Sequence, residues 1–235
     1  MVAKEKNMKV AIICAREGSS RIKNKNLKIL NNKPLIFYTV EAAINSKIFD
    51  KIYINSDSKK ILKQVKKHYS HNKLFFYLRP KAFGAGNIFV IDVIKEMISS
   101  LKIKKNYIAF ILFPTCPLRS HEDIKKTYKF YKKKRQSIVT VSRFDPPVSL
   151  SLKLRNGKLT PQFKEKYNLS TRHNDHKTTY FANFAIIIKK VSKLLRQRNL
   201  IGNDSVPFQL PFISSLDIDE KYQFDLAKKI LKFKK

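Results

Sequence analysis

Cysteine and glycine are scarce in this sequence, and their scarcity excludes several classes of site. The 235 residues include two cysteines, Cys14 and Cys116, which form no C-x-x-C pair and are too few for a thiolate zinc site. Both lie in or beside apolar segments, so we expect buried, reduced thiols rather than a disulfide or a nucleophile. The five glycines form neither a G-x-G-x-x-G motif nor a P-loop. If the protein binds a nucleotide, it uses another kind of loop.

Long apolar runs are also absent. The most apolar run, residues 107–113, falls far short of the roughly 18 residues that a membrane span requires. Residues 1–7, which we expect to be a short tail, lack the apolar stretch of a signal peptide. We therefore expect a cytoplasmic protein without a membrane partner.

Acidic residues are few, since 17 Asp and Glu stand against 50 Lys and Arg, for a formal net charge of +33. A charge of this size can mark a nucleic-acid-binding surface. Here, however, the basic residues are spread along most of the chain instead of being gathered in one tail or helix. We therefore expect a solvated, lysine-rich surface, and nucleic acid is not the expected partner. Because acids are rare, the cluster Asp217, Asp219 and Glu220 predicts a bound cation.

Short apolar runs alternate with longer segments of helical period. The expected strands are residues 9–15, 51–55, 74–78, 107–113, 137–142 and 184–188, and the expected helices are 34–44, a helix from about residue 58, 88–101, 121–134 and 222–233. This alternation predicts βαβ units, and therefore an α/β fold with a mainly parallel sheet in the middle of three layers. We expect residues 8–235 to form a single domain.

The alternation of strands and helices breaks between residues 145 and 179. In this excursion Asn156-Gly157 predicts the turn of a β-hairpin. The segment fits a flap over a site, a dimer arm or a loose loop.

The loop after the first strand, residues 16–27, combines cations with hydroxyl and amide side chains. Parallel sheets bind ligands beyond the carboxyl ends of their strands. Arg16 and Lys25 supply charge for a triphosphate, and Gly18 lets backbone N–H groups approach it. Composition alone leaves a second interpretation open, namely an exposed basic loop in a basic protein.

Segments spread over nearly the whole chain carry a more specific resemblance. They are, in order, Ala15–Leu27 running on to Lys33–Ile36, Asp50–Asp57, Pro114–Arg119 (Pro-Thr-Cys-Pro-Leu-Arg) and Ser215–Asp219 with its Asp-x-Asp. Together they resemble the CMP-N-acetylneuraminate synthetase (acylneuraminate cytidylyltransferase) family of CMP-sugar synthetases. The resemblance implies a Rossmann-like nucleotide-diphospho-sugar transferase fold. It also implies transfer of CMP from CTP to an acidic sugar, sialic-acid-like or another ulosonic acid, with release of pyrophosphate, for surface polysaccharide or glycan biosynthesis.

The resemblance also assigns roles to individual residues. Arg16 and Lys25 would bind the triphosphate and stabilise the charge that moves onto pyrophosphate, and Asp217 and Asp219 would hold Mg²⁺, so that Arg16, Lys25 and Asp219 form the catalytic set. The implied nucleotide-binding residues are Arg16, Gly18, Ser19, Lys25, Asn26, Arg79 and Thr115. These roles agree physically, because phosphoryl-type transfer depends on positioning and charge neutralisation, and a hard cation takes carboxylate oxygens.

Three further expectations accompany these assignments. Strand alternation would place Asp217 and Asp219 on one face, with Leu216 and Ile218 packed on the other; a surface turn capping the last helix is the alternative. For Arg79, a structural role is as plausible as a ligand role. The excursion at 145–179 matches the family's dimer arm in position, so we expect a homodimer.

The sequence departs from the family pattern at positions that tend to face the base or the acceptor sugar. Phe113 replaces a glutamine, Cys116 a serine, Gly86 and Asn87 an acidic and a hydroxyl residue, and Phe184 a glycine. The ring at Phe113 predicts either a less polar acceptor or a repacked pocket.

No histidine lies in a recognisable base motif, so we assign no general base. Two alternatives accompany the main interpretation. One is a related sugar nucleotidyltransferase with a different base or acceptor, and the other is a catalytically silent, basic polyanion-binding protein of the same fold.

Overall fold

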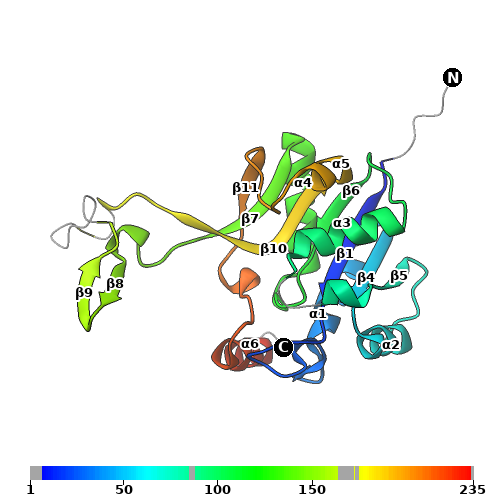
Figure 1. Cartoon of the computed structure of the whole chain (residues 1–235), viewed down its shortest axis with the longest axis horizontal. Coiled ribbons are helices and arrows are strands. Elements are labelled where there is room, and N and C mark those ends of the chain that lie inside the picture. The colour runs from blue at the N-terminus through cyan, green and yellow to red at the C-terminus, as the bar shows by residue number, and fades with distance from the viewer. Residues whose placement is uncertain (1–6, 85–87, 164–171, 173–174, 234–235) are drawn as a thin grey trace.

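A seven-stranded sheet runs through the computed structural model, which describes residues 7–84, 88–163, 172 and 175–233 (Figure 1). The strand order is β11-β7-β10-β6-β1-β4-β5. The bounds are β1 Lys9–Ala15, β4 Lys51–Ser56, β5 Leu74–Leu78, β6 Ile108–Ile111, β7 Ser137–Arg143, β10 Tyr180–Lys190 and β11 Ser205–Gln209. Every neighbouring pair is parallel except those of β10, which runs antiparallel to β6 and β7. The expected mainly parallel sheet is confirmed.

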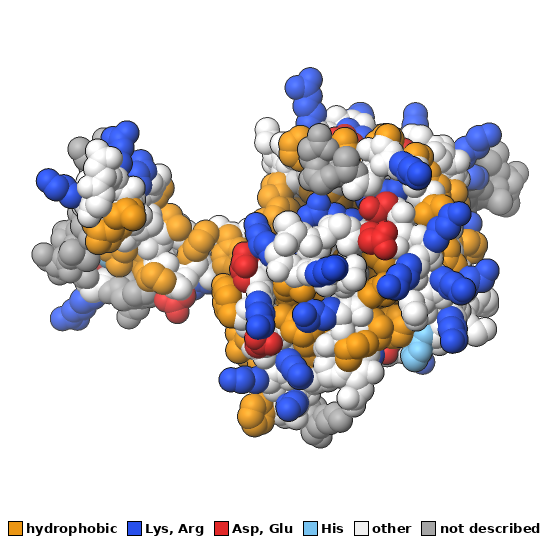
Figure 2. Space-filling model, turned by 60° about the horizontal axis from the view of Figure 1, so that its bottom comes forward, with side chains coloured by type: hydrophobic (Ala, Val, Ile, Leu, Met, Phe, Trp, Pro, Cys, Tyr) orange, Lys and Arg blue, Asp and Glu red, His pale blue; other side chains and the backbone are white. Residues whose placement is uncertain are grey.

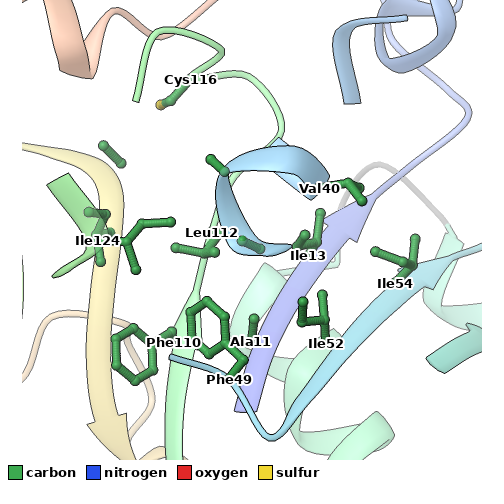
Figure 3. Close-up of a cluster of buried hydrophobic side chains, with 14 of the residues drawn as sticks. Ala11, Ile13, Val40, Phe49, Ile52, Ile54, Phe110, Leu112, Cys116 and Ile124 are labelled. Atoms are coloured by element: carbon green, nitrogen blue, oxygen red, sulfur yellow. The ribbon is translucent and has the colours of Figure 1, made fainter. Parts of the chain in front are cut away.

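Helices cover both faces of this sheet, which makes three layers. One face carries α1 (Leu35–Ser46), α2 (Lys59–His68) and α4 (His121–Lys134); the other carries α3 (Val90–Ser100) and α5 (Val191–Arg196). The β1 side chains alternate between the two faces, because Ala11 and Ile13 join the first core cluster while Val10 and Ile12 join the second. Figure 3 shows the first cluster, with Val40 of α1 beside Ile13. Burial on both faces explains why β1 reads as one continuous apolar run.

A third, smaller core joins the beginning of the chain to its end. The buried side chains of Ile22, Leu30, Leu118, Leu216 and Ile218 belong to it, together with others from α1 and from α6 (Lys221–Phe233). Leu30 lies in the short antiparallel pair β2 (Ile29–Leu30) and β3 (Lys33–Pro34). Figure 1 accordingly shows α6 beside the loop that follows β1. This core fixes the position of the loop relative to the Asp-x-Asp segment.

The excursion after β7 forms the expected hairpin. A 3₁₀ turn at Val148–Leu150 precedes β8 (Leu152–Arg155) and β9 (Lys158–Pro161), which pair antiparallel. The turn residues Asn156 and Gly157 have φ values of 48° and 73°, the left-handed geometry of a two-residue hairpin loop. Figure 1 shows the hairpin projecting away from the body of the molecule. The flap and the dimer arm both stay predictions for this excursion.

Several other expectations can be compared with the structure. Both cysteines are free; Cys116 is buried, as expected, whereas Cys14 is only partly buried. Lys and Arg side chains are scattered over the face seen in Figure 2 without forming one patch. Among the described residues, no helix is both long enough and apolar enough to cross a membrane. The cytoplasmic location and the domain boundaries at 8–235 and 145–179 stay predictions.

Candidate active site

A cleft of about 420 Å³ opens where strands of the parallel sheet end. The loop after β1 lines one side of it, the segment after β6 another, and the Asp-x-Asp segment a third. Of the residues implicated from the sequence, those that line it are Arg16, Ser19, Lys25, Asn26, Arg79, Thr115, Asp217 and Asp219. Residues as far apart in the chain as Arg16 and Asp219 therefore share one cavity.

Lys25 links the two ends of the chain inside this cleft. It opens a short 3₁₀ turn, Lys25–Leu27, that follows the left-handed residue Asn24 (φ 53°). Its Nζ donates to the carbonyl oxygen of Ile218 at 2.7 Å and to Oδ1 of Asp219 at 2.9 Å. The Lys25 side chain is 12% exposed and that of Asp219 is 51% exposed. Lys25 therefore fixes the position of a carboxylate that remains open to solvent and ligand.

Positive charge surrounds the Asp219 carboxylate. The hydrogen bond from Lys25 lowers the pKa of Asp219, and the charges of Lys25, Arg21 and Arg16 lower it further, while partial burial opposes them. Arg21 also forms ion pairs with Asp219 at 3.5 Å and with Glu220 at 3.2 Å. The carboxylate is consequently ionised at neutral pH, as a metal ligand must be.

Asp217 lines the cleft and has an unpartnered oxygen. Its Oδ1 is buried and accepts no hydrogen bond from the described residues. Burial raises the pKa of Asp217, while a hydrogen bond from the Thr115 side chain opposes the rise. The backbone N–H of Ile218 donates to the carbonyl oxygen of Thr115 at 2.8 Å, which holds the segment in place. An orphaned carboxylate oxygen beside a second carboxylate fits a hard cation such as Mg²⁺.

The alternation expected for this segment is present, although residues 216–219 form no regular strand. Leu216 and Ile218 are buried in the third core, while Asp217 and Asp219 line the cleft. No group of three or more His, Cys, Asp or Glu side chains that could hold a metal occurs in the described part of the chain. A Mg²⁺ ion here would take its remaining ligands from water and substrate phosphates, as this ion commonly does.

Arg79 and Asn26 brace the backbone around the cleft. Arg79 is 6% exposed, and its Nη2 donates to the carbonyl oxygens of Ala15 at 3.1 Å and Asn55 at 3.2 Å, at the ends of β1 and β4. Asn26 Nδ2 donates to the carbonyl oxygen of Arg16 at 2.8 Å. Arg79 thus has the structural role that the sequence left open. Its nucleotide contact stays a prediction.

Gly18 is the residue of the implied nucleotide set that does not line the cleft. A Cβ added there would meet no atom within 4 Å, so the described structure places no steric demand for glycine at this position. The expected approach of backbone N–H groups to a triphosphate stays a prediction.

The positions that depart from the family pattern fall in different surroundings. Phe113 lines the cleft, whereas Phe184 lines a neighbouring hollow. Cys116 is 1% exposed, and burial raises the pKa of its thiol to about 12, so it is a core residue. Gly86 and Asn87 lie outside the described residues.

Sequence reasoning missed an apolar wall of the cleft. Phe83, Phe89, Val90 and Val93 form it, around the start of α3. Apolar side chains carry no chemical signature in the sequence, so only the position of α3 beside the strand ends identifies them.

The fold and cleft define the class of protein. Over 97% of its length the chain superposes on the whole of a CMP:2-keto-3-deoxy-manno-octonic acid synthetase complexed with CTP, with a TM-score of 0.67 and 11% identity. A likeness at this identity shows the fold alone, which is that of the nucleotidyltransferases.

The family follows from sequence comparison, since residues 10–233 match the family model described as "Cytidylyltransferase". The chain belongs to the cytidylyltransferase family, and its resemblance to the CMP-sugar synthetases is confirmed. It is 32% identical, over 93% of its length, to an N-acylneuraminate cytidylyltransferase of Escherichia coli O18:K1:H7 (strain RS218 / NMEC). It is 30% identical, also over 93% of its length, to a Helicobacter pylori (strain ATCC 700392 / 26695) protein named pseudaminic acid cytidylyltransferase and UDP-2,4-diacetamido-2,4,6-trideoxy-beta-L-altropyranose hydrolase. The chain covers 51% and 41% of these two relatives, so it spans about half of their length.

Proposed function

We propose that this protein transfers CMP from CTP to a hydroxyl group of an acidic sugar and releases pyrophosphate. The observation that carries the proposal is the meeting of Lys25 and the Asp217–Asp219 pair in one cleft, with Arg16 at its edge. This arrangement combines cations for a triphosphate with carboxylates for a metal ion. The names of the relatives support an acceptor of the N-acylneuraminate or pseudaminic acid kind, both of which are acidic sugars.

The reaction needs no enzymatic nucleophile. The acceptor hydroxyl attacks the α-phosphorus of CTP, the bond from that phosphorus to the β-bridging oxygen breaks, and pyrophosphate leaves with the bonding electrons. The hydroxyl proton passes to solvent. Arg16 and Lys25 neutralise the charge that accumulates on the departing pyrophosphate, which is where electrostatic stabilisation lowers the barrier most.

Asp217 and Asp219 would hold Mg²⁺, which supplies further charge neutralisation on the phosphate oxygens when it is bound. The unpartnered Oδ1 of Asp217 supports this assignment. Lys25 keeps the Asp219 carboxylate ionised and oriented through its hydrogen bond.

We also propose a homodimer formed through the β8–β9 hairpin. Leu152, Leu154 and Leu159 are exposed on this hairpin at 44%, 73% and 67%. Exposed apolar side chains that lie together on a projecting element are typical of a surface that another chain covers.

A pyrophosphate-release assay tests the proposed reaction. The protein is incubated with Mg²⁺, one nucleoside triphosphate and a panel of eight- and nine-carbon acidic sugars, with ATP, GTP and UTP as controls for CTP. We expect release with CTP and at least one acidic sugar, and none when either substrate or Mg²⁺ is omitted. Absence of release with every sugar, or equal release with all four triphosphates, would overturn the proposal.

A further inference from the structure

A second hollow of about 370 Å³ adjoins the cleft, and Asp217 lines both cavities. Its walls come mainly from the first half of β10 and from the segment before α6. The apolar side chains among them are Phe181, Ala182, Phe184, Phe212 and Leu216. Because the proposed metal ligand is shared, a molecule in this hollow would lie next to a nucleotide in the cleft.

An aromatic pair links the two cavities, because one ring lines each of them. The rings of Phe113 and Phe184 pack edge to face, with centroids 6.2 Å apart and planes at 67°. Phe113 lines the cleft, and Phe184 lines both the second hollow and a further one beside Phe89 and Val90. Both positions depart from the family pattern, and the structure shows that these two departures are in contact. Such geometry is favourable for two rings and gives a firm apolar wall.

A buried polar network fixes the position of Phe184. Asn183 Nδ2 donates to Ser142 Oγ at 2.8 Å, and Asn183 Oδ1 accepts from Thr140 Oγ1 at 2.6 Å and from the N–H of Ala185 at 3.1 Å. The pairing of β10 with β7 shifts register in the same stretch, between Ala182 and Ile187.

Phe184 itself has φ 53°, a left-handed conformation that is rare for a bulky residue. The shift in the pairing of β10 with β7 and the hydrogen bonds of Asn183 therefore hold Phe184 in this conformation. A strained residue held by surrounding structure is typical of functional sites.

We propose that Phe113 and Phe184 together select the acceptor, favouring acidic sugars in which a methyl or methylene group takes the place of a hydroxyl-bearing carbon. The inference rests on the proposed function. A hydroxyl turned toward two phenyl rings loses its hydrogen bonds to water and gains none, whereas a methyl group is removed from water at no such cost. An apolar pocket discriminates against an added hydroxyl by about 10²-fold in kcat/KM.

The test uses matched pairs of acceptors. N-acetylneuraminic acid is compared with its 9-deoxy and 7-deoxy analogues, and each N-acetyl sugar is compared with its N-glycolyl form, so that each pair differs by one hydroxyl. Wild type is assayed beside Phe113→Gln, Phe184→Gly and the double variant, which restore the family pattern. Phe233→Ala, which removes an 89% exposed ring at the end of α6, is the control. The readout is the ratio of kcat/KM within each pair, so any loss common to both acceptors cancels.

We expect wild type and the control to prefer the less polar member of at least one pair by about tenfold or more. The preference should collapse in the double variant. Each single variant should lose most of it, because the two rings act as one wall. Thermal melting verifies that the variants are folded, and glycine at position 184 suits the left-handed backbone.

Two negative outcomes are distinct. No pyrophosphate release by wild type with CTP and any acceptor would overturn the proposed function and this inference with it. Release by wild type with a preference that the double variant retains, or with no preference in any pair, would overturn the selecting role of Phe113 and Phe184 and leave the proposed function standing.

Discussion

Replacing Lys25 by methionine removes the ammonium group while keeping most of the aliphatic stem. Two contacts are lost, those to the carbonyl oxygen of Ile218 and to Asp219 Oδ1. A hydrogen bond from a charged donor is worth about 1.5–3 kcal/mol. The ion pair adds roughly 0.2–1 kcal/mol, because the Asp219 side chain is half-exposed. We expect the free energy of unfolding to fall by about 2 kcal/mol.

The effect of Lys25→Met on catalysis should be larger than its effect on stability. Removing one preorganised group that stabilises developing charge typically lowers kcat by about 10²–10³-fold. The free energy of unfolding is measured by urea titration, and kcat and KM for CTP by pyrophosphate release at saturating acceptor. Assays run at a temperature where more than nine-tenths of the variant is folded keep the two effects separate.

Lys23→Met is the matched control. Lys23 is exposed in the same loop and does not line the cleft. We expect a change in the free energy of unfolding within about 0.5 kcal/mol and nearly unchanged turnover. If Lys25→Met lowers the free energy of unfolding but keeps the wild-type kcat/KM for CTP, Lys25 has a structural role only. The catalytic role given to Lys25 is then wrong.

Three further predictions concern the metal, the acid stability and the assembly. Asp219→Asn should abolish Mg²⁺-dependent pyrophosphate release with an unchanged circular dichroism spectrum, and wild-type activity in this variant would remove Asp219 from the metal site. The hydrogen bond from Lys193 lowers the pKa of Asp204 to about 2. The ionised Asp204 carboxylate therefore stabilises the fold fully above pH 3.8, the ordinary pKa of this group, and this stabilisation is lost as the pH falls through about 2. Urea titrations across that range should show that the free energy of unfolding falls less with pH for Asp204→Asn than for wild type. An equal fall in the two proteins would contradict the pKa shift. Leu154→Glu with Leu159→Glu should convert a dimer into a monomer in multi-angle light scattering, and a monomeric wild type at micromolar concentration would refute the dimer.

Elements that are buried on both sides or marked by caps could be predicted from the sequence. The bounds of β1 match the expected 9–15, because both of its faces are covered and the run from Val10 to Ala15 is apolar. The helix expected at about 121–134 is likewise confirmed. Ser120 and Asp123 form a capping box at its start, which is a local signal that needs no tertiary context.

Elements that depend on the rest of the fold were missed or predicted too short. The edge strand β11 contains Pro207, which argues against a strand in sequence and is tolerated because β11 pairs with β7 on one side only. The strand expected at 184–188 begins at Tyr180, since its first residues pair with β7 across a bulge at Phe184.

The candidate site shows the same division. Arg16, Lys25, Asp217 and Asp219 were found as chemical groups in recognisable motifs, and the structure adds that they line one cleft. The contact between Phe113 and Phe184 could not be found in this way. These residues lie 71 positions apart, and only the pairing of β10 with β6 brings them together.

A crystal structure of the protein with CTP and Mg²⁺ tests the account most directly. We predict that the triphosphate occupies the cleft with Arg16 and Lys25 on its oxygens, and that one Mg²⁺ ion contacts both Asp217 and Asp219 as well as the phosphates. A nucleotide bound elsewhere, or a metal ion that touches neither aspartate, would contradict the central claim.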